Sequence, residues 1–295
     1  MNILDDLKLQ YRIGGITTKL IFWNVLLFIV PEVVFSLLKL FLINIAYADF
    51  IGLSNVISDF LFKPWTIISY SFFHNGFFHL VSNVLMLNFV GRQFTTFFTQ
   101  KQLFGLYILG GIFGGIIYIT SYELLPLLAN QHALLVGASA SVMAILVATT
   151  VYQPLLEVRL MLLGTVKLWH IALVFIAIDL IQLPMENTGG HLAHLGGATF
   201  GFLYIKLIQN GTDLTIGVTK LLDFFSNLFS MKEKVPFKKV HRNVKPQPII
   251  KNESKIVTKT KSQQQIDEIL DKISKSGYDS LSSAEKEFLF KAGNS

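Results

Sequence analysis

Long apolar stretches alternate with short polar segments over the first 210 residues of the chain. Each stretch is close to the roughly 17–25 residues that a helix needs to cross a bilayer. The stretches lie near residues 20–38, 75–98, 102–121, 133–153, 166–184 and 190–209. The pattern therefore predicts an all-α membrane protein with a bundle of six transmembrane helices.

The character of the chain changes after the sixth stretch. Residues 231–263 hold ten Lys and Arg against two acidic residues, and three prolines interrupt any helix there. Apolar residues then return at helical spacing, and Ser282 with Glu285 matches a helix capping box. We expect an N-terminal cytoplasmic segment, a six-helix membrane domain, a basic linker and a small helical hairpin. Their limits are 1–19, 20–210, 211–263 and 264–295.

Composition favours the same class of protein. Hydrophobic residues make up 52% of the 295 residues and charged residues 15%, and the mean hydropathy is +0.53. These charges are too few to solvate a chain of this size as a soluble globule. The sequence has no cysteine, which excludes disulfides, thiolate chemistry and cysteine-based zinc sites.

The placement of positive charge predicts the orientation in the membrane. Basic residues gather before the first stretch, between the second and third, and between the fourth and fifth. They are Lys8, Arg12, Lys19, Arg92, Lys101, Arg159 and Lys167. By the positive-inside rule both termini are cytoplasmic, and we expect a multi-pass protein of a bacterial inner membrane. The basic linker lacks interleaved aromatic residues, so we expect it to bind anionic lipid and not nucleic acid.

Polar and ionisable side chains within predicted spans mark candidate functional residues. His79 and Asn83 are four residues apart, so they share one face of the second span. Ser139 follows Gly137 near the outer end of the fourth span, and His194 lies near the outer end of the sixth. At roughly 1.5 Å per residue the serine and this histidine have similar depths. A base within reach of a serine hydroxyl is the requirement for a serine nucleophile.

Acyl transfer also needs donors for the developing oxyanion. His79 and Asn83 enter from the outer side at a comparable depth, and the backbone N–H of Ser139 adds a third donor. We find no buried carboxylate placed to orient His194. We therefore expect a Ser-His dyad and not a triad.

The sixth stretch carries two histidines and a pair of glycines. Gly197 and Gly201 form a small-xxx-small face, which lets a neighbouring helix approach closely. His191 lies nearer the loop than His194, so we expect it to be exposed and the weaker candidate for a base. A metal site is disfavoured because the two histidines are three residues apart and no carboxylate completes the set. We expect neither metal nor cofactor.

Taken together, these residues resemble the rhomboid family of intramembrane serine proteases, over roughly residues 15–210. The motifs are Gly137-x-Ser139, Ala193-His194-x-x-Gly197-x-x-x-Gly201, and His79-x-x-x-Asn83 with His74 five residues earlier. The resemblance implies a six-helix core with Ser139 as nucleophile, His194 as general base, and His79 and Asn83 assisting the oxyanion. It also implies cleavage of a substrate's transmembrane helix near the outer boundary, without metal or cofactor.

Three positions depart from the pattern of the family. Ala140 stands where the family usually has a glycine directly after the nucleophile. Thr66 stands where an arginine often follows the loop tryptophan, and Met143 stands where an aromatic residue often lies four residues after the nucleophile. None of them removes a reacting group, so we expect effects on substrate preference and rate. His74 either supports the site as a neighbour of its residues or lies in the interfacial loop, and we favour the loop.

Two other classes of function compete with the protease. A catalytically silent rhomboid-like protein would bind membrane clients, but such proteins typically lack a catalytic residue and this chain keeps both. A transporter would need polar groups at the midplane, whereas these cluster toward one side and no inverted repeat is detectable. The expected partners are transmembrane protein substrates and membrane lipids. The terminal hairpin either packs loosely on itself or docks a partner.

Overall fold

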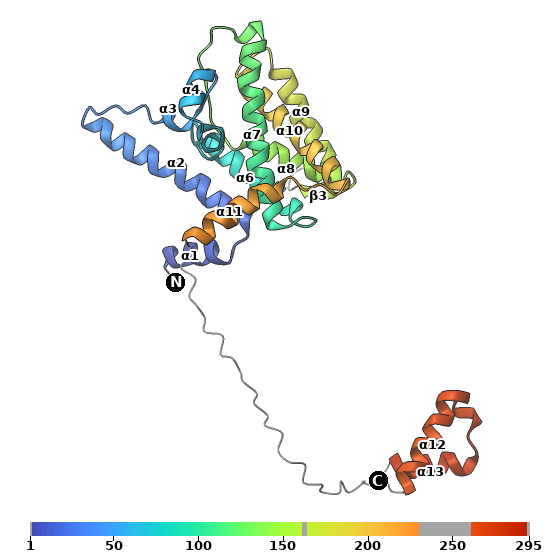
Figure 1. Cartoon of the computed structure of the whole chain (residues 1–295). Coiled ribbons are helices and arrows are strands. Elements are labelled where there is room, and N and C mark those ends of the chain that lie inside the picture. The colour runs from blue at the N-terminus through green and yellow to red at the C-terminus, as the bar shows by residue number, and fades with distance from the viewer. Residues whose placement is uncertain (1, 161–163, 230–260, 294–295) are drawn as a thin grey trace, which may run out of the picture. The chain divides into compact units, whose positions relative to one another are not determined.

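The protein is mostly helical and forms two compact units along the chain. The computed structural model describes residues 2–160, 164–229 and 261–293. The first unit is Met1–Glu233 and the second is Lys234–Ser295 (Figure 1).

Eight longer helices form the body of the described part of the first unit. They are α1 (Ile3–Ile13), α2 (Ile16–Leu40), α6 (Phe77–Phe94), α7 (Gln100–Leu124), α8 (Ser139–Tyr152), α9 (Leu168–Gln182), α10 (Thr188–Gln209) and α11 (Thr215–Phe229). Short helices occupy the connections after α2 and α7. They are α3 (Ala48–Ile51), α4 (Ile57–Phe62), α5 (Thr66–Ser69), η1 (Tyr70–Phe72) and η2 (Pro126–Leu128).

Two small antiparallel ribbons fix the loops at the helix ends. β1 (Leu53–Ser54) pairs with β2 (Leu134–Leu135), with Leu53 opposite Leu135. β3 (Glu157–Leu160) pairs with β4 (Gly164–Lys167) between α8 and α9. The first ribbon ties the long connection after α2 to the segment that leads into α8.

Helices α7, α8 and α10 pack against one another in the centre of the first unit, and α8 also contacts α6 and α9. Figure 1 shows these helices grouped together. Helix α8 is buried at every position from Ala140 to Thr149. A Cβ atom added to Gly197 would collide with the carbonyl oxygen of Ala140, and one on Gly201 with that of Ala144. The expected small-residue face of α10 therefore packs directly on the backbone of α8 at two successive helical turns.

Among the described helices, α2 and α7 are long and apolar enough to cross a membrane. Helices α8 and α9 are apolar but have only 14 and 15 residues. At 1.5 Å per residue they are roughly 21–23 Å long, less than the roughly 30 Å hydrocarbon core. Polar side chains interrupt α6 and α10. Length and hydropathy thus identify two candidate spans, and the full six-span bundle stays a prediction.

The fourth predicted span, 133–153, is helical only from Ser139. The residues before it are held as β2 and as a turn in which Gly137 has a φ of +131°. This conformation favours glycine because a side chain would be strained there. The chain therefore reaches Ser139 as a non-helical segment, and the serine stands at the first turn of α8.

Part of the predicted linker, 211–263, is also helical. Helix α11 packs against α7, and the Lys101 ammonium forms a 3.0 Å ion pair with Asp223 of α11. The stretch 230–260, which contains most of the basic residues of that prediction, lies outside the described residues. The prediction that the linker begins at residue 211 is therefore wrong, because Thr215–Phe229 form a helix packed on the first unit.

The second unit contains α12 (Lys261–Ser276), η3 (Tyr278–Ser280) and α13 (Ser283–Gly293). The chain turns at Gly277, which has a φ of +77°. The Ser282 backbone N–H donates to the Glu285 carboxylate at 2.7 Å, and the Glu285 N–H faces the Ser282 hydroxyl at 3.4 Å. This reciprocal contact is the capping box expected from the sequence.

Candidate active site

Ser139 occupies the start of α8, where backbone N–H groups have no partner within the helix. The loop before it is anchored at two points. The Gly137 N–H donates to the carbonyl of Tyr70 at 2.9 Å, and the Ala138 N–H faces His74 Nε2 at 3.5 Å. Ala138 has no polar side chain to cap the helix. The serine therefore lies at the positive end of the helix dipole, which favours negative charge beside it.

Ser139 and His194 are in hydrogen-bond contact. The Ser139 Oγ is 2.6 Å from His194 Nε2, although the residues lie 55 positions apart on different helices. The close packing of Gly197 on α8 brings the two helices together one turn below this contact. The imidazole is thus placed to accept the hydroxyl proton.

A buried carboxylate reaches the same histidine from α9. Asp179 is 4% exposed, and its Oδ1 is 2.8 Å from His194 Nδ1. The expectation that no buried carboxylate is placed to orient His194 is therefore wrong. It failed because α9 packs beside α10, an arrangement that spacing along the chain does not reveal. Asp179 is the one acidic residue in the apolar sequence of α9. An isolated ionisable residue in a predicted span is itself a signal of a functional residue.

His191 also contacts Asp179, at 2.7 Å between Nδ1 and the same Oδ1. It is 9% exposed, so the expectation of an exposed residue is wrong. The physical reason is that α10 already begins at Thr188, which places His191 inside the helix and against α9. Its ring meets the ring of His194 edge-on, with centroids 5.8 Å apart.

Asp179, His191 and His194 are also residue types that bind metals. Their nearest ligand atoms lie within 4.8 Å of one another, and no other described residues form such a group. The argument that no carboxylate accompanies the two histidines is therefore wrong. The separations of 2.7 and 2.8 Å are those of hydrogen bonds. A metal on this group would take up the ring atoms that otherwise bond to the carboxylate.

His79 and Asn83 lie on α6, facing the serine. A Cβ added to Gly137 would lie 2.7 Å from the His79 ring and 3.6 Å from Ser139 Oγ, so the three groups adjoin. The Asn83 amide donates to the His79 carbonyl at 2.9 Å. Both residues line a cavity of about 190 Å³ together with Ser139 and His194. The structure therefore brings all four predicted side chains to one cavity, between α6 and α9.

His74 lies in the loop between η1 and α6, but it is only 5% exposed, so it is a buried neighbour of the site and not the interfacial residue that we favoured. Its ring lies edge-on to that of His79, with centroids 5.2 Å apart. Burial, and then the neighbouring His79 ring, lowers the pKa of His74 to about 3. A neutral His74 supports both the His79 ring and the loop before Ser139.

The three departures from the family pattern occupy different places. Met143 lines the cavity beside Ser139. Ala140 supplies the backbone carbonyl on which Gly197 packs. Thr66 is buried in α5, where its hydroxyl donates to the carbonyl of Lys63 at 2.6 Å. Only Met143 is therefore positioned to contact a substrate.

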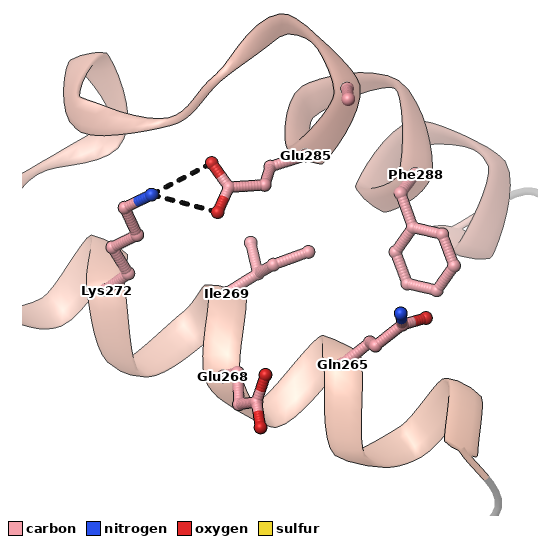
Figure 2. A pocket seen from close by; sticks show the side chains of 7 residues that line it. Gln265, Glu268, Ile269, Lys272, Glu285 and Phe288 are labelled. Atoms are coloured by element: carbon pink, nitrogen blue, oxygen red, sulfur yellow. Dashed lines mark hydrogen bonds and ion pairs between the residues drawn. The ribbon is translucent and has the colours of Figure 1, made fainter.

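The second unit has a cavity of its own, of about 480 Å³, between α12 and α13 (Figure 2). Lys272 reaches across it to the Glu285 carboxylate, at 2.9 and 3.0 Å. The described lining residues include no paired nucleophile and base. They are Gln265, Glu268, Ile269, Lys272, Ala284, Glu285 and Phe288.

Comparison with known proteins gives matches to both units. The Rhomboid domain model matches residues 61–210, and the model of a family of unknown function, DUF6576, matches 256–291. Rhomboid-related protein 1 of Caenorhabditis elegans is 29% identical over 158 residues, or 49% of this chain and 42% of that protein. Presenilin-associated rhomboid-like protein A, mitochondrial, of Danio rerio is 28% identical over 138 residues, or 46% and 35%. The chain thus spans less than half the length of either relative.

Proposed function

Because the chain belongs to the rhomboid family of membrane proteins, we propose that it is an intramembrane serine endopeptidase. Its substrates are membrane proteins, and it cleaves their transmembrane helices near the outer membrane boundary. The observation that carries the proposal is the 2.6 Å contact between Ser139 Oγ and His194 Nε2 at the wall of a cavity. A serine that serves packing alone needs no such base.

Acylation begins when Ser139 Oγ attacks the substrate carbonyl carbon and its proton passes to His194 Nε2. The carbonyl oxygen becomes an oxyanion, which accepts hydrogen bonds from the Ser139 N–H, His79 and Asn83. The C–N bond then breaks, and His194 returns the proton to the leaving amine. Water attacks the resulting ester, which releases the new carboxyl group and restores the serine.

The cavity supports access of the substrate between α6 and α9. Met86 of α6 and Phe175 of α9 line it with the proposed nucleophile and base. Beyond it, α9 exposes Leu173 and Val174, at 55% and 54%, as a face suited to lipid or to an apolar helix. A substrate helix arriving there must unwind locally, because the serine needs an accessible backbone carbonyl.

We also propose that α2, α6, α7, α8, α9 and α10 are the six spans, with both chain ends on the cytoplasmic side. The exposed apolar side chains of α2 and the basic residues at its start support this orientation. The expected bacterial inner membrane stays a prediction, since the two relatives come from a nematode and a fish.

Reconstituted cleavage tests the proposal. Purified full-length protein is placed in vesicles with a panel of single transmembrane helices tagged at both ends, and products are identified by mass spectrometry. We expect the wild type and Ser141→Ala to cut at least one helix near its outer end, and Ser139→Ala to cut none. Ser141 is the matched control because it lies two residues away, fully buried, with no described partner for its hydroxyl.

Two results would contradict the proposal. The first is cleavage by Ser139→Ala at the wild-type rate. The second is a folded wild type that binds these helices and cuts none, which favours the silent client-binding protein.

A further inference from the structure

Asp179 is an ionisable residue that is buried in an apolar helix. The rest of α9 is apolar apart from its first turn and its last residue, and the carboxylate is 4% exposed. A carboxylate removed from water is retained only where other groups satisfy it. Two imidazole nitrogens do so, both at a single oxygen, Oδ1.

The contacts form a continuous line from the carboxylate to the serine. Asp179 Oδ1 is 2.8 Å from His194 Nδ1, and the opposite nitrogen of that ring is 2.6 Å from Ser139 Oγ. An ionised carboxylate only accepts hydrogen bonds, so His194 Nδ1 must carry its proton. His194 Nε2 then keeps its lone pair toward the serine, which is the tautomer a general base needs.

We propose that Asp179 is a positioning residue that holds His194 in this tautomer and orientation and stabilises the imidazolium formed during reaction. This inference rests on the proposed protease function and deepens it. It replaces the expected dyad with a line of three residues drawn from α8, α10 and α9.

His191 adds a second hydrogen bond to the carboxylate oxygen that His194 contacts. It donates to the same Oδ1 at 2.7 Å and does not contact Ser139. It therefore acts through Asp179, by keeping the carboxylate in place while His194 gains and loses its proton. Removal of His191 should lower the reaction rate less than removal of Asp179, because His194 keeps its own hydrogen bond to the carboxylate.

The rate of labelling by a fluorophosphonate probe tests the role without a known substrate. In this reaction Ser139 Oγ bonds to phosphorus, the P–F bond breaks and fluoride leaves, while the serine proton passes to His194. The full-length wild type is compared with Asp179→Asn, Asp179→Glu and His191→Gln, with a chelator present. Saturation kinetics separate the maximal rate, kinact, from the binding constant, KI.

We expect kinact of Asp179→Asn to fall by about 10²- to 10⁴-fold, with KI and the thermal unfolding temperature close to those of the wild type. The kinact of His191→Gln should fall by about tenfold or less, and Asp179→Glu should recover part of the rate that Asp179→Asn loses. A merely structural role for Asp179 would lower unfolding temperature and raise KI instead. Labelling of Asp179→Asn at the wild-type rate would overturn the inference while leaving the protease function in place.

A second measurement does not depend on activity. Nitrogen NMR of ¹⁵N-histidine in Ser139→Ala, assigned by comparison with a variant that also lacks His194, reports which ring nitrogen carries the proton. The inference requires the Nδ1–H form at His194, and loss of that preference in Asp179→Asn. An Nε2–H form at His194 in the parent would overturn it. Failure of the wild type to label, with the expected tautomer present, would instead count against the proposed function.

Discussion

The two units place their polar contacts in opposite settings. In the first unit, Ser139, His194, Asp179 and His191 come from three helices and meet inside the bundle. In the second, Lys272 and Glu285 join neighbouring helices, and their side chains are 46% and 28% exposed (Figure 2). Each hydrogen bond of a buried network depends on the other members, whereas an exposed ion pair contributes little to stability. Substitutions in the network of the first unit should therefore change the rate of the reaction strongly. Substitutions at the Lys272–Glu285 pair should change only the local stability of the hairpin, and only slightly.

The largest expected effect comes from removing the base. His194→Ala should lower the cleavage rate by at least about 10⁴-fold, because the serine then has no acceptor for its proton. His170→Ala is the matched control, since this residue lies on α9, exposed beside Trp169. Its cleavage rate in vesicles should equal that of the wild type. Equal losses in the two variants would mean that histidine removal acts on the fold and not on the reaction.

The oxyanion donors should give the next largest effect. His79→Ala and Asn83→Ala should each lower the maximal rate by about 10²- to 10³-fold, as loss of a single donor does in such sites. Ser82→Ala is the control, because Ser82 lines the same cavity but is not one of the proposed oxyanion donors. The same donors should matter for labelling by a fluorophosphonate. A twofold change or less in either variant would remove that donor from the proposed site.

A smaller effect is expected from the packing beneath the site. Gly197→Ala places a methyl group against the carbonyl of Ala140, so we expect a loss of about 1–3 kcal/mol in unfolding free energy. Gly217→Ala is the matched substitution on α11, where an added Cβ meets nothing within 4 Å. It should be neutral or slightly stabilising. Unfolding in detergent measures both, and equal stability of the two variants would contradict the close contact of α8 with α10.

The smallest effect is expected in the second unit. Hydrogen bonds from Lys272 and from the Ser282 backbone lower the pKa of Glu285 to about 2. A carboxyl with a lowered pKa stabilises the folded hairpin above its ordinary value of 4.5, and this contribution is lost as the pH falls toward 2. Amide exchange in α13 of the full-length protein, corrected for intrinsic rates, should therefore show less protection at pH 3 than at pH 7.

Two lysine variants sharpen that measurement. Lys272→Ala should reduce protection of α13 at pH 7 by less than about fivefold, as expected for an exposed pair. Lys275→Ala is the control, because Lys275 pairs with Asp271 within α12 and does not reach α13. Neither should change cleavage by the first unit. A loss of cleavage in Lys272→Ala would show that the hairpin serves the membrane unit.

The comparison also explains what the sequence could predict. Depth pairs Ser139 with His194, because both predicted spans begin on the same side of the membrane in the predicted topology and residues can be counted inward from there. The capping box of Ser282 and Glu285 was readable because both residues lie within one helical turn. Contacts that follow from a common surface or from short spacing are therefore accessible to sequence reasoning.

The role of Asp179 cannot be predicted from spacing along the chain, because it depends on how α9 is rotated against α10. The burial of His191 escapes the sequence pattern for a different reason: the apolar pattern begins at Gly190, whereas α10 begins two residues earlier, at Thr188. The helical start at Ser139 was obscured by the apolar character of the residues before it, and only Gly137 marked the turn. Each of these misses concerns packing between elements or the exact end of one.

Mass spectrometry of the protein after treatment with a fluorophosphonate tests the central claim most directly. We predict one adduct on folded wild-type protein, located by fragmentation at Ser139, and no adduct on Ser139→Ala or His194→Ala. Labelling at another residue, or equal labelling of the wild type and His194→Ala, would contradict the claim that His194 activates Ser139.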